Sequence, residues 1–134
     1  MTANIRLGYV IIYVNDVAAT IEFYENAFGI KRRFVHESGQ YAEMETGTTA
    51  LAFVSEQMIG ESHSFRKNRR GDLSPGAEIA FVVEDVEKQY SIAFEAGAEE
   101  VEKPIQKSWG QTVAYVRDNN GFFVELCTQI ETVA

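Results

Sequence analysis

The sequence contains few residues that could cross-link it or bind a metal. It has one cysteine, Cys127, and two histidines among 134 residues. A single cysteine excludes an intrachain disulfide, and with it the framework that staples many small secreted domains. No apolar run approaches the ~20 residues needed to cross a bilayer. The N-terminal stretch MTANIRLGY lacks the apolar core of a signal peptide. These absences predict a cytoplasmic protein that does not associate with membranes.

Basic side chains are also scarce. Twelve Lys and Arg residues stand against twenty Asp and Glu residues, which gives a formal net charge of −8. Nucleic-acid binding requires a basic surface that neutralises phosphates, so this charge predicts no nucleic-acid partner. Hydrophobic residues make up 46% and charged residues 24% of the chain, which is typical of globular proteins. The length fits a single domain spanning residues 1–134.

An internal repeat is the most informative feature of the sequence. Residues 10–29 read VIIYVNDVAATIEFYENAFG, and residues 79–97 read IAFVVEDVEKQYSIAFEAG. Each segment starts with an apolar run, which is followed by an Asp-Val pair, a stretch with helical spacing and a glycine. Asp16 and Asp85 stand where an N-cap carboxylate accepts the unpaired amides of a first helical turn. Gly29 and Gly97 are placed to end the two helices in the left-handed conformation.

Apolar residues at helical spacing predict the buried face of each helix. The predicted faces are Val17, Ile21, Tyr24 and Phe28 in the first copy, and Val86, Tyr90, Ala93 and Phe94 in the second. Three short strands follow each helix, separated by turn residues. We expect them at 31–37, 40–46 and 49–55, and at 99–106, 111–117 and 122–128. The sequence therefore predicts an α+β fold of two βαβββ modules, at about 6–55 and 77–128.

Residues 56–76, EQMIGESHSFRKNRRGDLSPG, are expected to connect the two modules. Their polar composition and glycines favour a connector over a strand. The cluster of Arg66, Lys67, Arg69 and Arg70 fits a solvated linker better than the alternative, a basic lid over an anionic ligand.

The repeat closely resembles the vicinal oxygen chelate superfamily, which includes glyoxalases, bleomycin-resistance proteins and dioxygenases. Three segments carry the resemblance: GYVIIYVNDVAATIEFYENAFGI, EIAFVVEDV and DNNGFFVEL. The last is similar to the family's Asp-Pro-Asp-Gly turn with its apolar-Glu-Leu strand, with Asn119 in place of the proline. The resemblance implies an uncharacterised glyoxalase-like branch, a cup-shaped mixed sheet and a homodimer. It implies less about function, because this scaffold hosts lyases, dioxygenases and drug-sequestering proteins alike.

Metal enzymes of this superfamily place one ligand on each of four strands. The resemblance carries these positions over to Tyr9, Ala52, Glu78 and Glu125. None is a histidine, and His36 and His63 fall outside the set, in expected surface positions. We therefore expect no metal and no other cofactor. If a divalent metal binds, the resemblance assigns it to Glu78 and Glu125, whose carboxylates suit Mg²⁺, Mn²⁺ or Ca²⁺.

Strand alternation places the candidate ligand-binding residues on one side of the sheets. Val10, Ile12 and Val14 should pack under the helices, which leaves Tyr9, Ile11 and Tyr13 on the opposite face. The same reasoning places Glu78, Ala80, Phe123 and Glu125 on the face that would line the cup. Trp109 is expected in a loop at its mouth, either as a platform for a flat ligand or as an anchor for the core edge. Cys127 is expected to be a small apolar filler.

Three functions remain open at this point. The first is a small-molecule binding or sequestering protein without a complete metal site. Its ligand-binding residues would be Tyr9, Tyr13, Glu78, Trp109, Phe123 and Glu125. The second is a divalent-metal-dependent lyase, isomerase or dioxygenase that uses Glu78 and Glu125. The third is a dimeric interaction module whose cup is filled by side chains. The missing histidines favour the first function over the second, and Ala52 and Ala80 favour an open cavity over the third. The sequence leaves open whether the protein is an enzyme.

Overall fold

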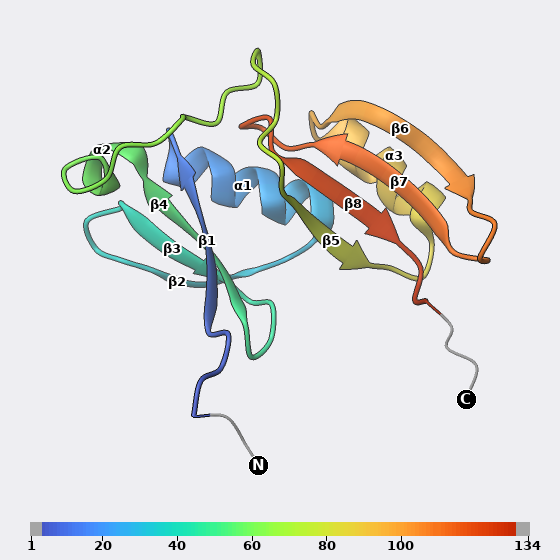
Figure 1. The fold of residues 1–134 in the computed structure, drawn as a ribbon, viewed down its shortest axis with the longest axis horizontal. Coiled ribbons are helices and arrows are strands. Elements are labelled where there is room, and N and C mark those ends of the chain that lie inside the picture. Colours follow the sequence, from blue (N-terminus) through green and yellow to red (C-terminus); the bar gives the residue numbers. More distant parts are fainter. Residues whose placement is uncertain (1–3, 131–134) are drawn as a thin grey trace. The chain divides into compact units, whose positions relative to one another are not determined.

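The computed structural model of the protein describes residues 4–130. It has an α+β fold with two four-stranded mixed sheets and three helices, as the repeat predicts (Figure 1). The described residues divide into two compact units. The first unit comprises residues 4–25 and 29–67, and the second comprises residues 26–28 and 68–130.

The first unit contains one sheet with the strand order β1-β4-β3-β2. Its elements in chain order are β1 (Tyr9–Val14), α1 (Val17–Phe28), β2 (Arg32–Val35), β3 (Tyr41–Met44), β4 (Ala50–Ser55) and α2 (Glu56–Ile59). Strand β1 is parallel to β4, and the other neighbours are antiparallel. The three C-terminal residues of α1 cluster with the second unit, where the Phe28 ring lies 5.1 Å from that of Phe81.

The second unit repeats this topology in the order β5-β8-β7-β6. Its elements are β5 (Glu78–Val82), α3 (Val86–Glu95), β6 (Glu99–Gln106), β7 (Thr112–Arg117) and β8 (Phe123–Cys127). The parallel pair is again formed by the first and last strands. The registers agree as well, since Ile11 lies opposite Ala52 in the first unit and Ala80 lies opposite Glu125 in the second. The repeat seen in the sequence is therefore a repeat of strand pairing.

The predicted helix ends are confirmed. The carboxylate of Asp16 accepts a hydrogen bond from Ala19 N at 3.0 Å, and that of Asp85 accepts one from Lys88 N at 3.0 Å. Gly29 ends α1 with φ of 68°, a conformation that costs other residues steric strain. Helix α3 ends slightly earlier than the pattern suggests, because Ala96 is its right-handed C-cap and Gly97 follows with φ of 105°.

Two predicted core positions are wrong. Phe94 is 50% exposed, although Ala93 beside it is fully buried. Successive helical residues are turned by about 100°, so only one of the two can face the sheet that α3 packs against. Val10 is 43% exposed, whereas Ile12 and Val14 are buried as expected. Val10 lies near the start of β1, which is an edge strand of its sheet.

The connector contains the short helix α2, which the composition of 56–76 did not reveal. Ser55 caps it by accepting a hydrogen bond from Met58 N at 3.1 Å. Farther along, the Arg117 guanidinium donates to the main-chain carbonyls of Arg69 and Asp72 and, through Nε, to that of Gly121 at 2.9 Å. A Cβ on Gly121 would clash with this guanidinium. Arg117 therefore fixes the C-terminal part of the connector to the second sheet.

Candidate functional site

One face of the second sheet is covered by α3, and the opposite face is left open. Val124 and Leu126 of β8 are fully buried on the covered side. Alternation then turns Glu125 to the open side, where it is half-buried. Glu125 lies opposite Ala80 of β5 and Tyr115 of β7. Because Ala80 carries only a methyl group, the Glu125 carboxylate has free space on the side of β5. On the side of β7 its neighbour is the phenol of Tyr115.

Glu78 and Glu125 form a pair of interacting carboxyls. Glu78 lies opposite Phe123, two residues before Glu125 on β8, so the two glutamates are diagonal neighbours on one face. The hydrogen bond between the two carboxyls, together with burial and charge repulsion, raises the pKa of Glu78 to about 7. The pKa of Glu125 is lowered even though burial opposes this, since Glu78 and Tyr115 hydrogen-bond to its carboxylate. The pair therefore takes up one proton as the pH falls through about 7.

Tyr115 and Lys107 complete the polar surroundings of Glu125. The Tyr115 hydroxyl donates a hydrogen bond to Glu125 Oε1 at 2.9 Å. Burial, followed by this bond, raises the pKa of Tyr115 to about 12, so the phenol stays a donor. The Lys107 ammonium lies 2.9 Å from Glu102 Oε1, and its charge also helps to lower the pKa of Glu125. The positive charge of Lys107 thus offsets part of the negative charge of Glu102 and Glu125.

A hollow of about 500 Å³ lies over this open face, and we call it the face hollow. Glu125, Tyr115 and Lys107 supply its charged and phenolic groups. The remaining lining residues are Ala80, Val82, Trp109, Gln111, Val113, Cys127, Thr128, Gln129 and Ile130. Its wall is mainly apolar with a few convergent polar atoms, which is the usual composition of small-molecule sites.

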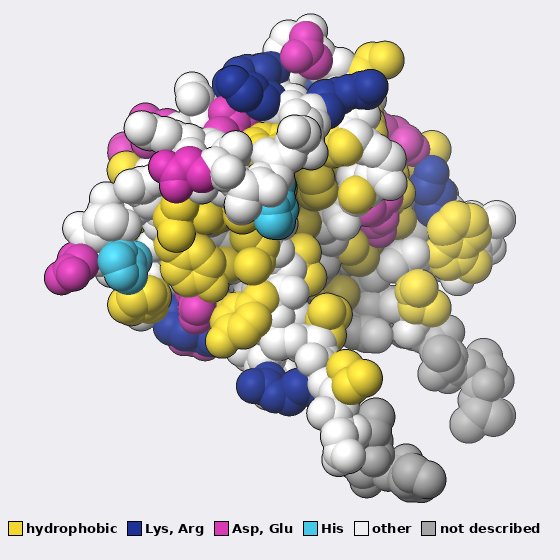
Figure 2. Space-filling view, turned by 60° about the vertical axis from the view of Figure 1, so that its left-hand side comes forward, with side chains coloured by type: hydrophobic (Ala, Val, Ile, Leu, Met, Phe, Trp, Pro, Cys, Tyr) yellow, Lys and Arg dark blue, Asp and Glu magenta, His cyan; other side chains and the backbone are white. Residues whose placement is uncertain are grey.

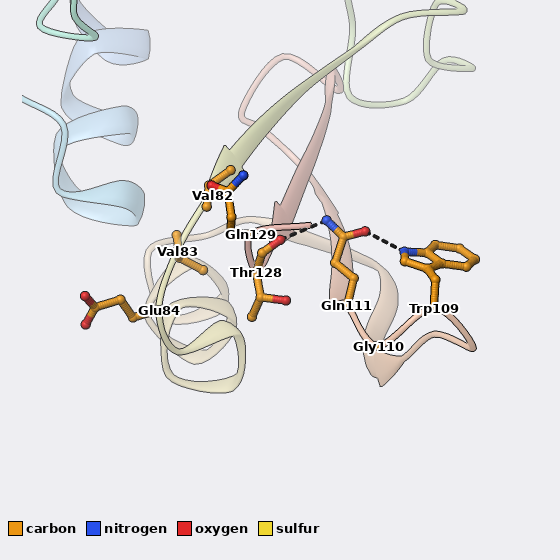
Figure 3. A pocket seen from close by; sticks show the side chains of 8 residues that line it. All are labelled: Val82, Val83, Glu84, Trp109, Gly110, Gln111, Thr128 and Gln129. Carbon is orange, nitrogen blue, oxygen red and sulfur yellow. Dashed lines mark hydrogen bonds between the residues drawn. The ribbon is translucent and has the colours of Figure 1, made fainter. Parts of the chain in front are cut away.

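Trp109 lies at the rim of the face hollow, and its side chain is held in place by a buried glutamine. Its indole Nε1 donates to Gln111 Oε1 at 2.8 Å, and Gln111 Nε2 donates to the carbonyl of Thr128 at 2.8 Å (Figure 3). Trp109 is nevertheless 64% exposed, whereas Gln111 is 8% exposed. An anchor for the core edge would be buried, so the exposure favours the platform interpretation.

Cys127 lines the face hollow but is unsuited to nucleophilic chemistry. It is buried, and its thiol donates to the carbonyl of Phe81 at 3.7 Å. Burial, together with the neighbouring Glu125, raises the pKa of the thiol to about 11. Because the thiolate is the reactive form, Cys127 is an apolar filler, as expected.

The predicted ligand-binding residues are divided between the two units. Glu125 and Trp109 line the face hollow, and Glu78 adjoins Glu125. Phe123 lies on the same sheet face but does not line the hollow. Tyr9 and Tyr13 belong to the first unit, where Tyr9 is 54% exposed and the Tyr13 ring packs edge-on against Phe65 at 4.8 Å.

Sequence reasoning missed Tyr115, Lys107 and Gln111. A signal for Tyr115 was present, because alternation in the strand TVAYVR buries Ala114 and Val116 and turns Tyr115 to the other face. Lys107 and Gln111 flank the turn that carries Trp109. Residues in a turn follow no regular spacing along the sequence. Only the folded structure therefore reveals that Lys107 and Gln111 face the hollow.

The first unit has an open sheet face of different character. Tyr9, Ile11 and Phe34 are 54%, 45% and 46% exposed, and Figure 2 shows hydrophobic side chains gathered on the face that it displays. Glu43 of β3 lies between Phe34 and Ala52 on this sheet and accepts a hydrogen bond from the Tyr41 hydroxyl at 2.9 Å. Ala52, which was expected to keep a cavity open, is fully buried.

The residues at the family's metal positions are divided between the two units, and none of them is a histidine. Tyr9 and Ala52 offer a phenol and a methyl group in the first unit, and Glu78 and Glu125 offer two carboxylates in the second. Within residues 4–130 no three His, Cys, Asp or Glu side chains are grouped to hold a metal ion. Both histidines are exposed, and His36 Nδ1 bonds with Ser38 Oγ at 2.8 Å. No described helix is long and apolar enough to cross a membrane.

Comparison with known proteins agrees with the family resemblance seen in the sequence. The sequence profile described as the Glyoxalase/Bleomycin resistance protein/Dioxygenase superfamily matches residues 6–126. The chain is 28% identical over 126 residues to the uncharacterized protein YraH of Bacillus subtilis strain 168, which covers 90% of this chain and 96% of YraH.

Solved structures share the fold. A family enzyme from Burkholderia phytofirmans PsJN aligns with a TM-score of 0.75 at 20% identity, over 91% of this chain and 97% of its own. A glyoxalase-related enzyme from Fulvimarina pelagi aligns with a TM-score of 0.79 at 17% identity, over 92% of this chain and 88% of its own. Identities this low indicate a common fold and do not transfer an activity.

Proposed function

Given that the chain belongs to the Glyoxalase/Bleomycin resistance protein/Dioxygenase superfamily, we propose that it binds or sequesters a small organic cation with a flat apolar body. The binding site is the face hollow of the second unit. The observation that carries this proposal is a half-buried carboxylate, Glu125, on the floor of a largely apolar hollow with an exposed indole at its rim.

The carboxyl pair provides the selectivity for a cation. A carboxylate removed from water requires partners. Those of Glu125 are a phenol, a second carboxyl and the Cys127 thiol, while the nearby cation, Lys107, already pairs with Glu102. A ligand ammonium supplies the missing positive charge. A charge-assisted hydrogen bond of this kind contributes about 1.5–3 kcal/mol, or roughly tenfold to more than a hundredfold in affinity.

The rest of the hollow favours a flat apolar body. Val82, Val113 and Cys127 provide an apolar wall, and Trp109 presents its ring to solvent. The Trp109–Gln111–Thr128 hydrogen bonds hold the indole before any ligand arrives, so little side-chain entropy is lost on stacking. Aromatic stacking and a cation near the indole face each contribute on the order of 1 kcal/mol.

The test is a calorimetric titration with naphthylmethylamine and two matched compounds. Naphthylmethanol keeps the ring and replaces the ammonium with a hydroxyl, while cyclohexylmethylamine keeps the ammonium and lacks a flat ring. We expect naphthylmethylamine to bind best, and Glu125→Gln to weaken it at least tenfold. Glu95→Gln, an exposed substitution at the end of α3 that removes the same charge, is the control. Equal binding of the amine and the alcohol would refute the proposal.

Two other outcomes would support the alternatives. Stoichiometric zinc, nickel or iron that survives purification and is lost in Glu125→Gln would favour a metal-dependent lyase, isomerase or dioxygenase. Absence of binding by any of the three compounds, combined with tight self-association, would favour an interaction module.

A further inference from the structure

The face hollow contains a positive group as well as a negative one. Lys107 lines the hollow together with Glu125, and its ammonium lies 2.9 Å from Glu102 Oε1. An ammonium has three donor hydrogens. Within residues 4–130, Glu102 is the only acceptor that the Lys107 ammonium contacts, so two of its hydrogens remain for a ligand.

Strand register places this ammonium on the open face of the sheet. Glu102 of β6 lies opposite Tyr115 of β7, and Tyr115 lies opposite Glu125 of β8. Residues directly opposite each other project to the same face of a sheet, so these three side chains form a row across three neighbouring strands. Lys107 pairs with Glu102 at one end of the row, and Glu125 is at the other end. A positive and a negative group thus lie on either side of the Tyr115 phenol.

The contacts around Lys107 hold it in place before a ligand arrives. Its main-chain N donates to the carbonyl of Gln111 at 2.7 Å, and its own carbonyl accepts from Gly110 N at 2.9 Å. The ion pair with Glu102 fixes the far end of the side chain. The same turn carries Trp109, whose indole donates to Gln111 (Figure 3). One turn therefore positions both the ammonium and the aromatic platform.

We propose that the ligand carries a neutral carbonyl on a short arm beside its ammonium, and that Lys107 donates a hydrogen bond to this carbonyl while Glu125 binds the ammonium. This inference rests on the proposed function of the face hollow and specifies its class of ligand as an aromatic amino amide. A carboxylate in place of the carbonyl would be repelled by Glu102 and Glu125, two negative groups around one ammonium. A neutral acceptor avoids this repulsion and still receives a charge-assisted hydrogen bond.

The carbonyl should make a modest contribution to affinity. A hydrogen bond from a charged donor is stronger than one between neutral groups. The Lys107 side chain is 27% exposed, however, and it already pairs with Glu102. Competition from water and from this carboxylate reduces the gain, so we expect the carbonyl to improve affinity by about three- to tenfold.

Calorimetric titration at about pH 6, where an α-amino group is protonated, tests the contact with three compounds that share a naphthyl ring and an ammonium. Naphthylalaninamide carries the carbonyl, its isopropyl analogue has an isopropyl group in place of the carboxamide, and naphthylalanine carries a carboxylate. We expect the amide to bind the wild-type protein about three- to tenfold more tightly than the isopropyl analogue. The acid should bind more weakly than the amide.

Lys107→Met isolates the contact because it removes the ammonium and keeps an unbranched side chain. The amide should lose its advantage in this variant. The isopropyl analogue should bind the variant at least as tightly as the wild type, because a positive charge near the ligand ammonium has been removed, and such binding also shows that the hollow is intact. Lys103→Met, an exposed substitution on β6 that removes the same charge, should preserve the advantage of the amide.

The outcomes separate the two proposals. If naphthylmethylamine and the isopropyl analogue both fail to bind, the proposed function is wrong, and this inference fails with it. If the isopropyl analogue binds but the amide shows no advantage, or keeps its advantage in Lys107→Met, the proposed function stands and the contact with Lys107 is refuted. Tighter binding of the acid than of the amide would refute the neutral acceptor.

Discussion

The carboxyl pair makes a quantitative prediction about pH. The pKa of Glu78 is about 7 because its carboxyl faces that of Glu125. Below this pH the pair carries one negative charge, and above it the pair carries two. Binding of an organic cation should therefore strengthen as pH rises from 6 to 8. The increase is at most tenfold per pH unit below the pKa, which is the limit when binding requires loss of the proton.

Two substitutions isolate the cause. Glu125→Gln removes the repelling partner, so the pKa of Glu78 should fall from about 7 toward the ordinary 4.5. Glu78→Gln fixes the pair at a single charge, so the binding constant should lose its dependence on pH between 6 and 8. Carbon-detected NMR of the glutamate carboxyls measures the first effect, and calorimetry measures the second. A glutamate titration near 7 that persists in Glu125→Gln would refute the reasoning.

The same pair has a consequence for stability. A carboxyl whose pKa is raised in the folded state holds its proton more tightly than in the unfolded chain. Its contribution to the free energy of unfolding is therefore complete below pH 4.5 and is lost as pH rises through about 7. Since Glu78 is exposed, solvent screening keeps this effect small.

Three further predictions concern the rest of the molecule. Arg117→Met removes the hydrogen bonds that fix the connector. It should therefore lower the free energy of unfolding in urea by about 1–3 kcal/mol and speed tryptic cleavage at residues 66–70. Unchanged cleavage would show that other contacts hold the connector. The Cys127 thiol should react with a disulfide reagent at pH 8 far more slowly in the native protein than in the denatured protein, given its pKa of about 11; equal rates would contradict its burial. Sedimentation equilibrium at micromolar concentration should give twice the mass of one chain, since the family resemblance implies a homodimer and each sheet ends in edge strands, which need to be paired or covered. A monomer at all concentrations would contradict this.

Much of the fold could be predicted because its determinants are local and periodic. Asp16 and Asp85 cap their helices, and the strand alternation around Ile12 and Glu125 places each side chain on its expected face. The shared sheet face of Glu78 and Glu125 was also expected, because the family resemblance places them on the first and last strands of the second module and strand alternation turns both to one side. The proton shared by the pair is the effect expected for close carboxyls.

The remaining features depend on contacts between distant residues. Tyr115 reaches Glu125 only because β7 pairs with β8 in one register. Trp109 is oriented by Gln111, whose side chain in turn bonds to the main chain of Thr128. Phe94 satisfied the helical spacing but lies outside the strip of α3 that packs on the sheet. Spacing along the chain cannot report such pairings, since they are set by how the strands and turns assemble.

The central claim is that the open face of the second sheet binds a flat organic cation at Glu125. Amide chemical-shift mapping with naphthylmethylamine tests it most directly, because it reports where the compound binds as well as whether it binds. The account predicts that the shifts cluster at residues 80–82, 107–115 and 125–130, and that reaching them takes at least tenfold more compound in Glu125→Gln but not in Glu95→Gln. Shifts that cluster outside these segments, or that follow the same concentration dependence in Glu125→Gln as in the wild type, would contradict it.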